Sequence, residues 1–161
     1  MLIKSQLSGS EFIRINLQIM YSRKAVQILT ALMPLAVVCI PLMQFLSQRT
    51  IDWGTIIAPI AILLFLPAST YYNARKNYAA NKQIGEPATY TFEQESFSVQ
   101  GSSYTATIAW NNVHKINQTS TGLLIWTSER IAIILSRKSF TEAQLAELKK
   151  ILDANEVPNN L

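Results

Sequence analysis

The sequence predicts an α+β membrane protein: a two-helix transmembrane hairpin, then a small antiparallel β-meander that a C-terminal amphipathic helix closes. The first indication is the distribution of charge, because only Arg49 and Asp52 are charged between positions 25 and 74. The second is a change of pattern after residue 84, where apolar and polar residues alternate in short runs. The third is an apolar stripe at helical spacing near residue 150. A single water-soluble globule is therefore excluded.

Residues 1–24 form a lead-in that we expect to be helical and cytoplasmic. Ser8 and Glu11 have the spacing of a capping box, and Phe12, Ile15 and Ile19 fit one face of a helix. Isoleucine and leucine also occupy alternate positions in this segment, which is the pattern of a strand. We favour a helix that runs into the first span, and the strand remains the alternative.

Residues 25–74 contain two apolar runs, each long enough to cross a membrane. The runs hold 24 residues before Arg49 and 22 residues after Asp52, none of them charged. A helix needs about 20 residues to cross a hydrocarbon layer of roughly 30 Å. Their polar residues gather towards the ends rather than on one face. We therefore predict transmembrane helices over about 25–47 and 53–74. The first is too long for a signal peptide and has no small-residue cleavage site, so it is expected to stay as an anchor.

Each span carries prolines, which are expected to kink it. A transporter would use such broken helices as a substrate site, but neither span holds an ionisable residue to mark an ion path. We therefore favour two bent helices packed on each other. Small residues on one face of the second span would also allow a homo-oligomer. The prolines are Pro34, Pro41, Pro59 and Pro67, and the small residues are Gly54, Ala58 and Ala61.

The short connection at 47–52 predicts a tight hairpin, so both outer ends emerge on one side of the bilayer. At the tip, Arg49 is offset by Asp52, whereas the outer flanks are basic, which places both termini in the cytoplasm. The net charge of +4 arises in these flanks, because residues 83–161 hold six basic and eight acidic residues. Nucleic-acid binding needs a basic face, so it is not expected. The flank residues are Arg14, Arg23, Lys24, Arg75, Lys76 and Lys82.

Residues 84–161 are predicted to form a cytoplasmic domain. Gly85–Glu86–Pro87 ends any helix that leaves the membrane. Six short runs follow, separated by turn residues, which predicts an antiparallel meander. The runs cover about 90–92, 97–99, 104–110, 113–118, 123–127 and 131–135.

A helix follows the last strand. Thr141 and Gln144 predict a capping box, and Phe140 is placed to pack on Leu145. Leu145, Leu148, Ile151 and Leu152 form its apolar stripe. Pleckstrin-homology-like domains also have several strands followed by one amphipathic helix, and the segment resembles them.

The chain over about 8–155 resembles the YcxB-like family of bacterial membrane proteins. The resemblance is carried by the lead-in, the two spans and four motifs in the domain. The family usually has proline before its basic pair, where this chain has Ser136. The resemblance implies architecture and a place in the bacterial inner membrane, and it implies no reaction. The motifs are Tyr90–Thr91–Phe92, Trp110–Asn111–Asn112–Val113–His114–Lys115–Ile116, Leu123–Leu124–Ile125–Trp126 and Arg137–Lys138–Ser139–Phe140.

The residues that could carry chemistry are few. Cys39 and His114 are the only cysteine and histidine, too few for a zinc site, and both are expected to be structural or solvated. Trp110 and Trp126 are expected in the core, although they could form an aromatic platform. No catalytic, metal-binding or cofactor-binding residues are identified, so we expect no enzyme and no cofactor.

The basic spot predicted on the domain consists of Arg130, Arg137 and Lys138. We favour a solvated edge there, and contact with a lipid headgroup or a partner protein is the alternative. The first function hypothesis is a membrane-tethered interaction or regulatory module that displays the domain to a protein partner or lipid. A small transport subunit or a membrane immunity factor is the second, and a membrane enzyme is the last.

Overall fold

A computed structural model describes residues 1–48, 50 and 52–161. It divides into two compact units, which are described separately. The first comprises Met1–Ile15 and Lys76–Leu161, and the second comprises Asn16–Arg75. Arg49, on which the predicted charge of the hairpin tip partly depends, lies outside the described residues.

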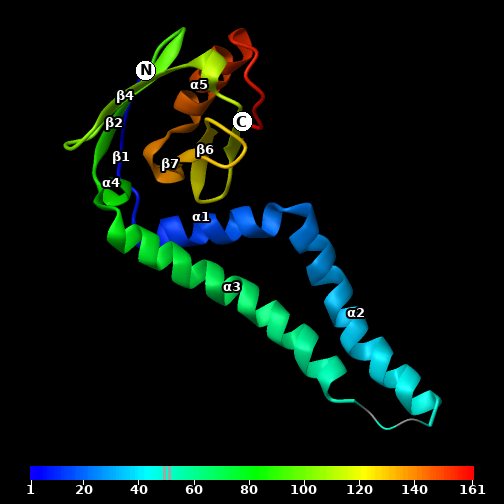
Figure 1. Cartoon of the computed structure of the whole chain (residues 1–161). Helices are drawn as coiled ribbons and strands as arrows, with labels where there is room; N and C mark the ends of the chain where they lie inside the picture. The colour runs from blue at the N-terminus through cyan, green and yellow to red at the C-terminus, as the bar shows by residue number, and fades with distance from the viewer. Residues whose placement is uncertain (49, 51) are drawn as a thin grey trace. The chain divides into compact units, whose positions relative to one another are not determined.

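The first unit contains two antiparallel sheets, and they confirm the strands predicted from the alternating runs. One sheet has the order β1-β2-β3-β4 and the other has the order β5-β6-β7 (Figure 1). A 3-10 turn, η1 (Trp110–Asn112), separates them, because the chain turns where the Trp110 side chain enters the core. The strands are β1 (Leu2–Ser5), β2 (Ala88–Phe92), β3 (Ser96–Gln100), β4 (Thr105–Ala109), β5 (Lys115–Gln118), β6 (Gly122–Trp126) and β7 (Ala132–Ser136).

Strand β1 was not predicted, since residues 1–24 were expected to be helical. It pairs with β2 in antiparallel register, with Ile3 opposite Tyr90, and the two strands lie side by side in Figure 1. Its alternation is only four residues long, with Ile3 and Ser5 buried and Leu2 and Lys4 exposed. So short a pattern gives little signal without its distant partner. As a result, the compact unit includes residues 1–15 and extends beyond the expected boundary at residue 84.

Helix α1 (Gly9–Ser22) confirms the helix favoured for the lead-in. It starts with a capping box: the Glu11 amide donates to Ser8 Oγ at 3.3 Å, and the Ser8 amide donates to Glu11 Oε2 at 3.1 Å. Phe12 and Ile15 are buried, so the first half of the helix belongs to the core of this unit.

The core lies between the two sheets and α5 (Glu142–Ala154). The ring of Phe92 stacks on those of Phe97 and Trp110, and Trp110 Nε1 donates to the Glu93 carbonyl at 3.0 Å. The predicted capping box of α5 is present. Trp126, also expected in the core, is only partly buried, and Lys115 Nζ lies 5.5 Å from the centroid of its ring.

The second unit contains most of two long apolar helices, α2 (Lys24–Leu46) and α3 (Gly54–Ala80). Their most apolar windows have mean hydropathies of 2.2 and 1.7, so both have the length and composition of candidate membrane spans. Each helix runs on through its two prolines. Within the described residues, 0% of either window is buried, so the mutual packing expected for the spans is not seen. A short helix, α4 (Lys82–Gly85), follows α3.

Candidate functional site

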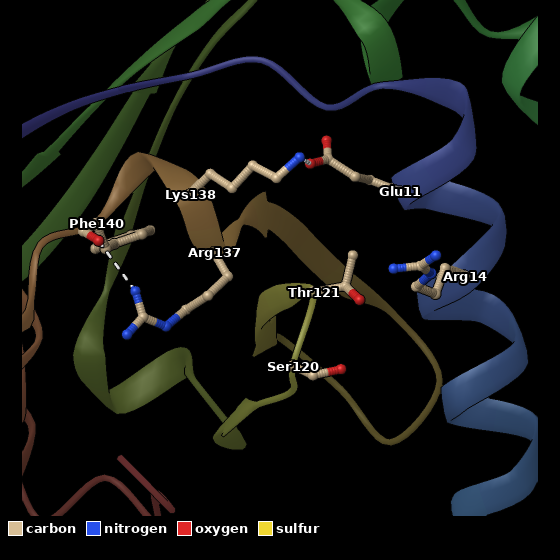
Figure 2. Close-up of a pocket in the computed structure, with 7 residues that line it drawn as sticks. All are labelled: Glu11, Arg14, Ser120, Thr121, Arg137, Lys138 and Phe140. Atoms are coloured by element: carbon tan, nitrogen blue, oxygen red, sulfur yellow. Dashed lines mark hydrogen bonds and ion pairs between the residues drawn. The ribbon is translucent and has the colours of Figure 1, made fainter.

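A pocket of about 290 Å³ opens beside the first half of α1 (Figure 2). Three segments of the first unit line it: α1, the turn between β5 and β6, and the 3-10 helix η2 (Arg137–Ser139) with the residue that follows it. Its polar lining residues are Glu11, Arg14, Ser120, Thr121, Arg137 and Lys138, and Phe140 completes it.

Next to the pocket, α1 approaches β6 very closely. A Cβ placed on Gly122 would lie 2.5 Å from Ile15 Cδ1 and 2.9 Å from the carbonyl oxygen of Leu135. Only glycine leaves room for the fully buried Ile15 at this point. The Arg137 amide in turn donates to the Thr121 carbonyl at 3.0 Å, which fixes η2 against the β5–β6 turn.

Glu11 and Lys138 form an ion pair across the mouth of the pocket, with Nζ 3.1 Å from Oε1. The Lys138 side chain is 85% exposed, whereas that of Glu11 is only 12% exposed. Burial favours the neutral form of Glu11, but hydrogen bonds from the Ser8 amide, Lys138 and the Ser8 hydroxyl outweigh it, so its pKa lies below the usual value. Glu11 is therefore a carboxylate at neutral pH.

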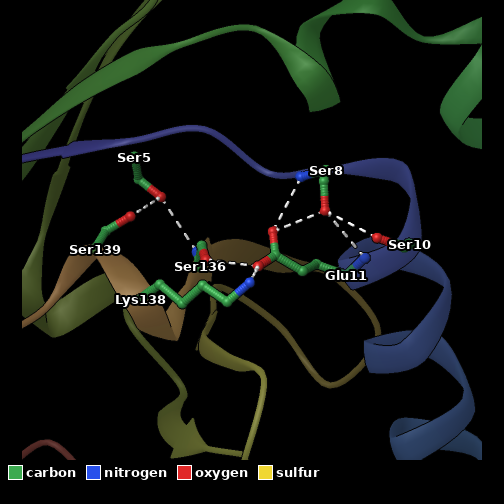
Figure 3. Close-up of polar contacts among 7 residues, drawn as sticks. All are labelled: Ser5, Ser8, Ser10, Glu11, Ser136, Lys138 and Ser139. Carbon is green, nitrogen blue, oxygen red and sulfur yellow. Dashed lines mark hydrogen bonds and ion pairs between the residues drawn. The ribbon is translucent and has the colours of Figure 1, made fainter.

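Serine side chains join β1 and α1 to the end of β7 (Figure 3). The Ser136 amide donates to Ser5 Oγ at 3.2 Å, and Ser136 Oγ donates to Glu11 Oε1 at 3.3 Å. Ser139 Oγ lies 3.0 Å from Ser5 Oγ. Proline at position 136 would have no amide hydrogen to make the first of these bonds. The serine at this position thus helps to hold β1 in place.

The other two basic side chains of the pocket, Arg137 and Arg14, differ in their contacts. Arg137 Nη1 donates to the Phe140 carbonyl at 3.0 Å, and Nη2 is ion-paired with Glu142, so its partly buried guanidinium is fixed. Arg14 is exposed, and its side chain makes no ion pair or hydrogen bond within the part of the chain that the structure describes. Figure 2 shows Arg14 reaching towards Thr121 from the α1 side.

The structure brings only part of the predicted basic spot together. Arg137 and Lys138 line the pocket, but Arg130 lies in the turn before β7, and Arg137 follows the other end of that strand. A five-residue strand is roughly 17 Å long at about 3.3 Å per residue, so Arg130 is remote from the pair. Arg14 takes a place in the pocket, although the sequence suggested only a topological role for it.

Glu11 was identified only as a helix cap. Its approach to Lys138 depends on β1, and no pattern in the sequence indicated that strand. The other flank residues, Arg23, Lys24, Arg75, Lys76 and Lys82, are exposed. His114 is exposed, and Cys39 lies on the exposed surface of α2. Among the described residues, no group of three or more His, Cys, Asp or Glu side chains is placed to hold a metal ion.

Comparison with known proteins gives a family match. Neither the curated proteins nor the solved structures contain one that the chain matches. A family model does match, over a segment that starts at the last residue of β2 and ends within α5. Residues 92–152 match the family described as YcxB-like protein, and the family predicted from the sequence is thereby confirmed for this segment.

Proposed function

We propose that the chain is a membrane-anchored, non-enzymatic interaction module. In this proposal α2 and α3 cross the bacterial inner membrane as a hairpin, and the unit of Met1–Ile15 and Lys76–Leu161 is displayed in the cytoplasm. The YcxB-like match and the two candidate spans are consistent with a membrane-associated module. Beyond this, the proposal places the folded unit on the cytoplasmic side of the membrane and gives it a binding role.

The observation that carries the proposal is the contrast in burial between the two units. The first unit has a closed core, in which Phe97, Ile125 and Leu148 are fully buried. In α2 and α3, by contrast, 0% of either apolar window is buried, and Leu35 and Phe65 are 59% and 69% exposed. Soluble monomers rarely expose contiguous apolar patches above a few hundred Å². Lipid, or a second copy of the chain within the bilayer, is the environment that suits such helices.

The distribution of charge supports the cytoplasmic side. Exposed basic residues occur before α2, at Arg23 and Lys24, and along the last turns of α3, at Arg75 and Lys76. Such residues are retained on the cytoplasmic side of bacterial membranes. The connection between the helices contains Asp52, whose carboxylate accepts a hydrogen bond from the Gly54 amide at 2.9 Å.

Cysteine accessibility in intact cells tests this topology. Cys39 is the only cysteine, so Cys39→Ser gives a clean background. Thr50→Cys then places one thiol between the helices, and Ser128→Cys places one in the exposed β6–β7 turn. A membrane-impermeant maleimide should label the first variant in whole cells and the second only after the inner membrane is permeabilised.

The reverse labelling pattern would refute the cytoplasmic placement. Extraction of the chain by alkaline carbonate would refute the membrane anchor itself. Labelling of both variants in intact cells would exclude a hairpin that crosses the bilayer twice.

A further inference from the structure

The pocket beside α1 gathers positively charged side chains on the first unit. Arg14, Arg137 and Lys138 line it together with Glu11, whose carboxylate pairs with Lys138, while Arg137 pairs with Glu142. Residues 83–161 carry more acidic than basic residues, so this concentration is local. A cationic pocket of this kind attracts anions, and a partly enclosed site strengthens the attraction relative to open water.

The donors converge on the pocket from different elements. Arg14 enters from α1 and Lys138 from η2, and the hydroxyl-bearing Ser120 and Thr121 belong to the turn between β5 and β6. Arg137 adds its charge from the far side, where Phe140 and Glu142 hold its guanidinium. Arginine presents a planar fork of donors, and lysine presents a compact charge on a flexible stem. Together they suit an acceptor with several oxygen atoms pointing in different directions.

Glu11 sets the charge that a ligand must have. Its carboxylate neutralises Lys138 at 3.1 Å when the pocket holds no anion. An incoming anion must compete with it for Lys138 and also tolerate its negative charge. A singly charged carboxylate gains little from that exchange. A phosphomonoester carries about −1.5 to −2 charges and three acceptor oxygens, so it can engage Arg14 and Lys138 together.

From these observations we infer that the pocket binds a phosphate group, with Arg14 and Lys138 as its principal contacts. The volume of about 290 Å³ is at the lower end of small-molecule sites and suits a phosphate or a small phosphomonoester headgroup. This inference deepens the proposed function, on which it rests, by naming a ligand class for the displayed domain. Inorganic phosphate and a lipid phosphomonoester share the required chemistry.

Titration of inorganic phosphate into the full-length chain tests the inference. The chain is held in an uncharged detergent at constant ionic strength, and binding is followed by calorimetry. Wild-type protein should bind saturably, at one phosphate per chain. Arg14→Gln should weaken binding by about tenfold or more, which is the effect of losing one charge-assisted hydrogen bond. Glu11→Gln should strengthen it several-fold, because Lys138 is released and a like charge is removed.

Arg130→Gln is the matched control, since it removes the same charge from an exposed arginine outside the pocket. It should leave phosphate affinity unchanged. The inference is overturned if wild-type protein does not bind phosphate, or if Arg14→Gln and Arg130→Gln have equal effects. It is also overturned if Glu11→Gln weakens binding while the variant keeps the wild-type melting temperature.

A competition experiment distinguishes the two sources of phosphate. Short-chain phosphatidic acid should displace inorganic phosphate from wild-type protein if the site takes a lipid headgroup, whereas short-chain phosphatidylcholine should not. If neither lipid competes while phosphate still binds through Arg14, the ligand is a soluble phosphate. Binding in detergent does not depend on topology, so failure here leaves the anchor intact, and failure of the maleimide test leaves the pocket intact.

Discussion

The close approach of α1 to β6 predicts a large cost for the smallest substitution at Gly122. In Gly122→Ala, the new methyl group would lie 2.5 Å from Ile15 Cδ1 and 2.9 Å from the Leu135 carbonyl oxygen. Neither neighbour can move easily, because Ile15 and Leu135 are both fully buried and the oxygen belongs to the backbone of β7. Overpacking of a core costs about 1–3 kcal/mol. Alanine recovers part of this, about 0.5–1 kcal/mol, because glycine loses more conformational freedom in a strand.

We therefore expect Gly122→Ala to destabilise the first unit by about 1–2 kcal/mol. In a domain of this size, this lowers the melting temperature by roughly 4–8 °C per kcal/mol. Thermal unfolding of the full-length chain in detergent, followed by tryptophan fluorescence, measures the shift. Exchange of the backbone amide hydrogens should also become faster in residues 9–15, because the packing of α1 against β6 is weakened there.

A double-mutant cycle tests the cause of this loss. Ile15→Val removes the Cδ1 atom that the new methyl group would meet, at its own cost of about 0.5–1.5 kcal/mol. The double variant should be less destabilised than the sum of the single variants, by about 1 kcal/mol. Gly101→Ala is the control, because the three atoms nearest to its Cβ all belong to the partly exposed ring of Tyr104. Strict additivity of Gly122→Ala and Ile15→Val would refute the steric explanation.

Three further changes test other parts of the structure. Thr141→Ala removes the α5 capping box and should lower the free energy of unfolding by about 1 kcal/mol, measured by thermal unfolding; an unchanged midpoint would contradict the cap. Trp110→Ala should cost about 3–5 kcal/mol, with loss of near-ultraviolet circular dichroism if the chain still folds. The lowered pKa of Glu11 adds stability that is present above the pKa of an unfolded glutamate, about 4.3, and that is lost as the pH falls through the folded value. An acid titration of wild-type protein should show this loss, and Glu11→Gln should show a smaller one.

Local patterns in the sequence were sufficient for much of the fold. The alternation of Tyr90, Phe92, Phe97 and Val99 places these side chains on the buried face, as the register of β2 and β3 shows. The α5 cap and stripe depend on residues within four positions of one another, so they were predictable too. The uncharged runs likewise indicated α2 and α3, because length and composition alone define a candidate span.

The candidate site depends on contacts that no local pattern reveals. The ion pair between Glu11 and Lys138 depends on two contacts that position α1. Strand β1, which precedes α1, pairs with β2, and Gly122 leaves space for the Ile15 side chain. Both contacts join segments far apart in the chain. Arg130 does not join Arg137 and Lys138 at the pocket, because the strand β7 extends between them. Trp126 is only partly buried, and Lys115, its partner on the neighbouring strand β5, lies over its ring.

The pairing of β1 with β2 also dictates an order of events during synthesis. Ser5 pairs with Ala88, so the first strand has no partner until both long helices have left the ribosome. In the proposed topology, membrane insertion of the hairpin would then precede closure of the domain. Closing a flexible loop of this length carries an entropic cost, and an inserted hairpin that returns the chain to the same side would reduce it. The anchor would thus act on folding as a covalent crosslink does, and removing it would slow domain assembly as well as release the domain from the membrane.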